Sequence, residues 1–165
     1  MAAIELKFVC DEMLQGLGRW LRTAGYDTKI ATNGEDDRAL LKWARKEGRL
    51  FLTRDRRLLS ENGAYAESVV LLMANDLSGC VAELTRRIGI DWLNAPFSRC
   101  LLCNHPLITI ERDRQPPMAE PLPQDVWDKG PVLYCEVCRK AYWEGSHVRR
   151  MRAKLEAFAR QSSTG

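Results

Sequence analysis

The chain lacks any long apolar segment, since no stretch of its 165 residues approaches the roughly 18 apolar residues that a membrane-spanning helix requires. The N-terminus also lacks the basic flank and cleavage site of a secretion signal, and residues 1–8 read as a strand. Disorder is disfavoured as well, because 45% of the residues are hydrophobic and 28% are charged. These absences predict a globular, cytoplasmic protein without membrane contact.

Histidine is scarce and the net charge is small. The formal charge is +3, and all of the excess lies after residue 98. Near the C-terminus Arg149, Arg150 and Arg152 would attract a polyanion such as RNA, although a solvated helix face explains the same residues equally well. One of the two histidines, His147, directly precedes this basic run and is a candidate RNA contact, with structural packing as the alternative.

Four of the six cysteines form two CxxC pairs, Cys100 with Cys103 and Cys135 with Cys138. Each pair can place two thiolates on one tight turn, and two facing turns give the four-sulfur tetrahedron that zinc prefers. The proline-rich segment 115–123 allows the long interval between the pairs to loop out. A redox motif is the alternative, but it would need only one pair. We predict one structural zinc ion held by these four cysteines.

The first 98 residues alternate strand-like and helix-like segments. We expect strands at 6–10, 28–32, 49–53 and 68–73, and helices at 14–24, 36–47, 57–61 and 78–88. The unbroken apolar run at 69–72 is typical of a strand buried on both faces. Within the second helix Leu40, Trp43 and Ala44 should point inward, and Ser78 should cap the fourth. The alternation predicts an α/β fold, a parallel sheet with helices on both faces.

A small zinc-ribbon module and a C-terminal helix should follow the sheet. Ser146 could cap that helix, and apolar residues recur along it at helical spacing. They are Val148, Met151, Leu155 and Phe158. We therefore divide the chain into a domain at 1–98 and a zinc ribbon with its closing helix at 99–165.

Acidic residues follow each expected strand at what should be one edge of the sheet, where open parallel sheets bind ligands. They are Asp11, Asp36, Asp37, Asp55 and Asp76. Clustered carboxylates repel one another unless a cation lies among them, and they are the hard ligands that magnesium and manganese take. Each aspartate could instead simply cap a helix. We predict a metal-binding acidic site with Glu12 and Asp76 as its weakest members.

Several motifs together resemble one protein family. Residues 8–14, 18–22, 25–28 and 52–56 resemble the PIN-like RNase domain found at the C-terminus of Mut-seven exonucleases and as free-standing prokaryotic proteins. Residues 99–104, 134–138 and 142–147 are similar to that family's zinc ribbon and the start of its closing helix. The resemblance implies a metal-dependent ribonuclease that hydrolyses RNA phosphodiesters.

In that family pattern Asp11, Asp36 and Asp55 match the acids that bind magnesium or manganese, which activate a water for in-line attack. Asp37 stands where relatives often carry glutamate, and Asp76 is a distal candidate. Four arginines lie close in sequence to the acids and are candidate phosphate contacts. They are Arg19, Arg22, Arg54 and Arg56.

Two other functions stay open at this point. A receiver-like phosphoacceptor domain would also carry acids after its first and third strands, but it should continue with a lysine after a fifth strand, for which the sequence has no counterpart. A non-catalytic adaptor would bind RNA or protein through the ribbon and the basic helix. The oligomeric state is not predicted.

Overall fold

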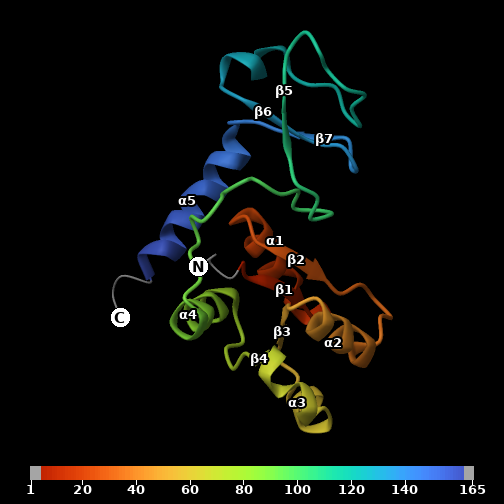
Figure 1. Ribbon diagram of the computed structural model, residues 1–165. Coiled ribbons are helices and arrows are strands. Elements are labelled where there is room, and N and C mark those ends of the chain that lie inside the picture. The colour runs from red at the N-terminus through yellow and green to blue at the C-terminus, as the bar shows by residue number, and fades with distance from the viewer. Residues whose placement is uncertain (1–4, 162–165) are drawn as a thin grey trace.

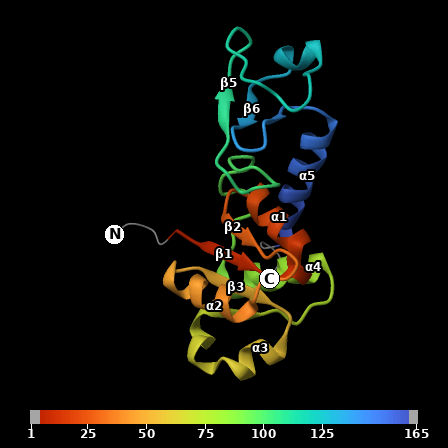
Figure 2. The ribbon, with the colours of Figure 1, turned by 90° about the vertical axis from the view of Figure 1, so that its right-hand side faces the viewer.

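The computed structural model describes residues 5–161, which form a parallel α/β sheet, a smaller antiparallel sheet and a long C-terminal helix (Figures 1 and 2). The two sheets lie at opposite ends of the molecule, and the C-terminal helix runs along one side from the smaller sheet back to the larger one. None of the helices in this described part is long and apolar enough to cross a membrane.

The larger sheet has four parallel strands in the order β2-β1-β3-β4, which confirms the predicted α/β class. Its strands are β1 (Lys7–Cys10), β2 (Asp27–Ile30), β3 (Leu50–Thr53) and β4 (Val69–Leu71). From β1 the chain moves outward to β2, and it then crosses back to place β3 on the other side of β1. The carboxyl ends of β1 and β3 therefore flank the point where the strand order reverses, which is where open α/β sheets bind ligands.

Helices cover both faces of this sheet. They are α1 (Gln15–Thr23), α2 (Asp37–Lys46), α3 (Arg56–Glu61) and α4 (Leu77–Ile88), with short 3-10 turns η1 (Glu12–Leu14) and η2 (Gly63–Ser68). Side chains alternate along a strand, so Phe8 and Cys10 of β1 pack with α1 and α4, while Val9 packs with α2 and α3. The predicted two-sided core is thus confirmed.

Two sequence expectations about burial are wrong. Trp43 of α2 is 37% exposed, and the Arg49 guanidinium lies over it, 5.0 Å from the centre of the Trp43 ring. Leu41 takes the inward position instead. The strand β4 lies at the edge of the sheet, so Val69 and Leu71 are only half-buried. An apolar run indicates burial on both faces only for an inner strand.

The smaller sheet is antiparallel, with strands β5 (Ile108–Ile110), β6 (Val132–Cys135) and β7 (Lys140–Tyr142) in that order. The proline-rich excursion loops out between β5 and β6, as predicted, and returns through the turn η3 (Gln124–Asp128). The Tyr134 hydroxyl donates a hydrogen bond to the Pro117 carbonyl at 2.7 Å, which ties this loop to the sheet.

The C-terminal helix α5 (Ser146–Gln161) packs back onto the first domain, and its predicted apolar stripe faces that core. Phe158 makes edge-to-face contacts with Trp20 of α1 and with Trp92, at centroid distances of 5.3 and 5.2 Å. Ser146 is the first helical residue rather than the cap, because the first helical bond runs from the Arg149 amide to the Gly145 carbonyl. The closing helix therefore shares its core with residues 1–98.

Arg22 joins the two parts of the molecule. Its Nε donates to the Thr28 carbonyl, and one terminal nitrogen donates to the carbonyls of Leu101 and Leu102, each at 2.9 Å. The residue is 6% exposed. Its predicted role as a phosphate contact is therefore wrong, since protein carbonyls already occupy the buried guanidinium.

Asn104 makes the second link between the two parts. Its side chain accepts a hydrogen bond from the Thr28 amide at 3.0 Å and donates one to Asp27 at 2.7 Å. Asp27 in turn forms a two-pronged ion pair with Arg49, with both N–O distances 2.8 Å. Burial alone would raise the pKa of Asp27, but the hydrogen bonds from Arg49 and Asn104 outweigh it and hold the pKa at about 2.

We predict that Arg22→Met lowers the free energy of unfolding by about 3 kcal/mol or more, because hydrogen bonds from a charged group are lost and buried carbonyls are left without partners. Arg86→Met, at an exposed position of α4, serves as the control and should change stability by less than about 0.5 kcal/mol. Urea denaturation measures both, and equal stability of the two variants would contradict the structural role of Arg22.

Candidate functional site

The four cysteines of the CxxC pairs come together between the smaller sheet and α1. All four sulfur atoms lie within 4.8 Å of one another, with 3.9 Å between Cys100 and Cys138 and 3.4 Å between Cys103 and Cys135. Zinc–sulfur bonds of about 2.3 Å in a tetrahedron place the sulfurs about 3.8 Å apart. The size and the donor chemistry of this cluster fit zinc.

Each CxxC turn ends in a residue with left-handed backbone conformation. Asn104 follows Cys103 with φ 71°, and Arg139 follows Cys138 with φ 55°. Their amides close the turns on the carbonyls of Cys100 and Cys135, at 2.9 and 2.8 Å. The two halves of the cluster are therefore built alike.

Burial raises the pKa of Cys135 and Cys138, whereas nearby donors lower the pKa of Cys100. The Tyr142 hydroxyl lies 3.2 Å from the Cys100 sulfur. Burial would raise the pKa of Cys100, but hydrogen bonds from Tyr142 and from backbone amides outweigh it and lower the pKa to about 7. A cysteine that ionises near neutral pH binds a cation readily, since the thiolate is the ligand.

The aspartates at the other end of the molecule act as helix caps. One oxygen each of Asp11, Asp36, Asp55 and Asp76 accepts a hydrogen bond from a backbone amide at the start of η1, α2, α3 and α4 respectively. The cap of α4 is thus Asp76. The sequence had suggested Ser78, and that prediction is wrong. The capping alternative is confirmed for these four, while Asp37 is the first residue of α2 and caps nothing.

Three of the acids line one open hollow of about 400 Å³ at the carboxyl edge of the sheet. Asp36 and Asp37 come from the start of α2, and Asp55 comes from the start of α3. Glu35 and Glu61, which sequence reasoning did not select, line the same hollow. Partial loss of hydration raises the pKa of Asp37, and the charges of Asp11, Asp55, Asp36 and Glu12 raise it further.

Asp11 is fixed at the centre of this edge, where β1 and β3 end. It is 6% exposed, and its two oxygens accept hydrogen bonds from the Met13 amide and the Thr53 hydroxyl. The same Thr53 oxygen accepts a hydrogen bond from the Asp55 amide at 2.9 Å. Thr53 therefore links the two acids that follow the central strands.

The described acidic side chains do not lie close enough together to form a complete set of ligands for a cation. Among the described residues, the four cysteines are the one group of three or more His, Cys, Asp or Glu side chains close enough together to hold a metal ion. Asp76 lies apart from the acidic hollow, in a separate hollow beside Arg54 and Cys80. Asp76 does not line the hollow of Asp36, Asp37 and Asp55, because it caps α4 after the edge strand β4.

The candidate phosphate contacts differ in their surroundings. Arg54 donates to the Asn75 carbonyl at 2.9 Å and lies with Asp76, away from the acidic hollow. Arg19 and Arg56 are exposed on α1 and α3. Arg57, which sequence reasoning missed, lines the acidic hollow, as does Arg38.

The basic side chains on α5 make more contacts within the protein than the sequence suggests. Arg152 forms an ion pair with Glu144 and lies over the Phe97 ring, 5.0 Å from its centre. Lys154 lies 5.4 Å from the Trp20 ring centre. Arg149 and Arg150 are exposed, as is His147. Of the predicted RNA contacts on this helix, His147, Arg149 and Arg150 are therefore more accessible than Arg152.

Comparison with known proteins decides the family. The Mut7-C RNAse domain matches residues 6–155, which include the whole sheet, both CxxC pairs and most of α5. The chain belongs to the Mut7-C RNase domain family. A human protein described as "Exonuclease mut-7 homolog" is 53% identical over 47 residues, a segment that covers 28% of this chain and 5% of that protein. No solved structure matches.

The family assignment bears on the alternatives. The predicted resemblance to the Mut-seven RNase domain is confirmed. A receiver-like domain is disfavoured, because the described parallel sheet has four strands and an antiparallel module with the four-cysteine cluster follows it. Membership of the Mut7-C family fits a ribbon that is part of the fold and not an added module.

For the four-cysteine site we predict about one zinc per chain by metal analysis. Cys138→Ser should release the zinc and unfold the ribbon, because metal binding and folding of such modules are coupled. Cys80→Ser removes a thiol outside the cluster and should retain zinc. Two disulfides and no zinc in an anaerobically purified protein would contradict the assignment.

For the acidic hollow we predict that Asp37→Asn raises the melting temperature of the metal-free protein at pH 7. A raised carboxyl pKa means that the charged form disfavours folding, so the gain is present above the folded pKa and absent below the unfolded value of about 3.9. Asp113→Asn is a control at an exposed loop position. An Asp37→Asn gain that persists at pH 3 would exclude charge repulsion as its cause.

Proposed function

We propose that the chain is a ribonuclease that cuts RNA phosphodiesters with magnesium or manganese bound at the carboxyl edge of the parallel sheet. The observation that carries this proposal is the convergence of Asp11, Asp36, Asp37 and Asp55 on the point where the strand order reverses. Membership of an RNase domain family supports it.

The donor set fits a hard divalent cation. Carboxylate oxygens are the ligands that magnesium and manganese take, and the charge crowding at Asp37 is relieved when a cation enters. Such an ion would activate a water and stabilise the charge that develops on the phosphate. Asp11, Asp36 and Asp55 are the proposed ligands, with Asp37 as a further carboxylate at the rim.

The protein residues hold these carboxylates in place. The Thr53 hydroxyl and the Met13 amide fix both oxygens of Asp11, so this acid is already oriented before substrate arrives. Amides at the starts of α2 and α3 fix one oxygen each of Asp36 and Asp55, at 3.3 and 2.8 Å. A carboxylate has about four lone-pair positions, so capping leaves acceptor capacity for a cation.

Cationic side chains stand beside the acids. Arg38 and Arg57 line the hollow, and each is exposed. Guanidinium groups recognise phosphates with two parallel hydrogen bonds, so these two arginines are suited to hold the RNA backbone across the carboxylates. Arg56 stays a candidate for the same role.

We predict that Asp11→Asn and Asp55→Asn each reduce manganese-dependent RNA cleavage by more than about 100-fold while the protein stays folded. Asparagine is nearly isosteric and can still cap a helix, so little packing is lost. Asp76→Asn is the matched control, since it changes a capping aspartate outside the acidic hollow and should keep most of the activity.

Manganese titration of the melting temperature provides the second readout. A ligand that binds only the folded protein raises its stability, so the parent protein should melt higher with manganese and Asp11→Asn should not respond. Full cleavage by folded Asp11→Asn and Asp55→Asn would overturn the metal-nuclease mechanism. A parent protein that neither cleaves RNA nor responds to manganese would favour the non-catalytic adaptor.

A further inference from the structure

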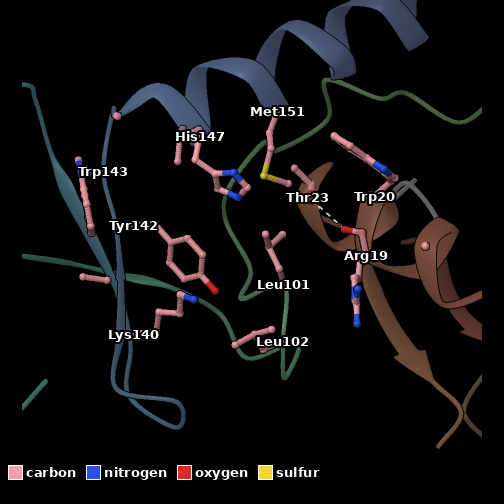
Figure 3. A pocket seen from close by; sticks show the side chains of 14 residues that line it. Arg19, Trp20, Thr23, Leu101, Leu102, Lys140, Tyr142, Trp143, His147 and Met151 are labelled. Atoms are coloured by element: carbon pink, nitrogen blue, oxygen red, sulfur yellow. Dashed lines mark hydrogen bonds between the residues drawn. The ribbon is translucent and has the colours of Figure 1, made fainter. Parts of the chain in front are cut away.

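A second hollow lies between the two parts of the molecule, away from the acidic edge. It has a volume of about 530 Å³, within the size range of small-molecule sites, and its walls come from α1, the first CxxC turn, β7 and the start of α5. We call it the interdomain cleft. Figure 3 shows His147 and Met151 reaching into it from α5, with the Tyr142 ring on the facing side.

The lining of the interdomain cleft combines apolar surface with positive charge. Leu102, which is 57% exposed, and half-buried Trp143 supply apolar and aromatic surface. Arg19 and Lys140 stand at opposite walls and both are exposed. No aspartate or glutamate is among the described residues that line it. A ligand with a flat apolar part and negative charge beside it matches this pattern.

We propose that the interdomain cleft binds an unpaired base of single-stranded RNA, while Arg19, Lys140 and His147 contact the adjoining phosphates. The proposal rests on the proposed function, because it names the form of RNA that reaches the acidic site. A base stacks on aromatic and apolar side chains whatever its identity, and it can enter a pocket only when it is not paired in a duplex.

The cleft adjoins a surface that leads toward the acidic edge. Gly16, at the start of α1, lines both the interdomain cleft and the hollow that contains Met13 and Arg54. Apart from its chain neighbours and the backbone of its own helix, no described atom lies within 4 Å of where a Cβ of Gly16 would be, so the surface there is open. Met13 lies two residues after Asp11, and its backbone amide donates a hydrogen bond to the Asp11 carboxylate. RNA held in the cleft would therefore leave it past the start of α1, on the side of the molecule where Met13 lies.

An apolar segment of a protein is the competing occupant. It would use the leucine and tryptophan surface, but it offers nothing to Arg19 and Lys140, whose charges would lose hydration without a partner. An acidic peptide would satisfy the charges but not the flat apolar walls. Single-stranded RNA satisfies both, because each nucleotide supplies a base and a phosphate.

The two CxxC turns offer a matched pair of variants. Leu102 directly precedes Cys103, and Val137 directly precedes Cys138, at the equivalent position of the second turn. They are 57% and 62% exposed, but Val137 does not line the cleft. Leu102→Asp puts a carboxylate into the cleft, and Val137→Asp adds the same charge outside it.

Binding is measured by fluorescence anisotropy with labelled single-stranded oligoadenylate, without added magnesium or manganese so that no cleavage occurs. Leu102→Asp should weaken binding about 10-fold, the loss expected for one stacked base, and Val137→Asp should weaken it less than about 2-fold. The parent protein should prefer this RNA over a ribose-phosphate oligomer without bases, and Leu102→Asp should abolish that preference. Zinc content and melting temperature confirm that each variant is folded.

If Leu102→Asp loses zinc, Arg19→Gln with Arg86→Gln as its control tests the same cleft from α1, and only the first should weaken binding. Equal RNA affinity of the cleft variants and their controls would overturn the proposal, as would a parent protein that does not bind single-stranded RNA. The nuclease mechanism is judged separately by cleavage in manganese. Cleavage with unchanged affinity in Leu102→Asp refutes the base pocket alone, and tight binding without cleavage refutes the nuclease alone.

Discussion

The buried guanidinium of Arg22 is the constraint on which the arrangement of the two parts depends. It satisfies a carbonyl of β2 and two carbonyls of the first CxxC turn, and the latter are 79 and 80 residues away in the chain. A charged group buried without partners would be strongly destabilising, so the ribbon has to keep these carbonyls in reach. The position of the four-cysteine cluster against α1 follows from this requirement, and so does the interdomain cleft, whose wall includes Leu101 and Leu102.

Asn104 couples the same joint to the four-cysteine cluster. It holds the left-handed conformation that closes the first CxxC turn, and its side chain also bridges to Asp27 and the Thr28 amide. Glycine would adopt the backbone conformation more easily, but it could not make the bridge. A metal that orders the turn thereby orders a contact with β2, and the ribbon and the sheet become one unit. The packing of Phe158 against Trp20 and Trp92 closes this unit from the other side.

The sequence predicted what depends on local spacing. Apolar periodicity gave all four parallel strands, and the two CxxC pairs gave the metal cluster, because thiols three residues apart meet on one turn. It failed where a residue's environment comes from distant parts of the chain. In the sequence Arg22 is an ordinary arginine of an amphipathic helix, and only the folded ribbon supplies the carbonyls that it binds. Trp43 has the spacing of an inward residue, but it lies under Arg49 in the structure. The interdomain cleft could not be predicted from the sequence for the same reason, since Arg19 and Lys140 are far apart in the chain.

The aspartates show why capping and metal binding could not be separated by sequence. An aspartate after a parallel strand stands at the start of the next helix, so it both accepts an amide hydrogen bond and faces the ligand edge. The aspartates differ in the strand ends that they adjoin. Asp11 and Asp55 follow the two central strands and share Thr53, whereas Asp76 follows the edge strand β4 and caps α4 in a different hollow. Asp37 forms no cap, yet partial loss of hydration raises the pKa of its carboxyl, and four neighbouring acids raise it further. Capping alone does not require that crowding, and a helix start that only needed a cap would be more stable without it.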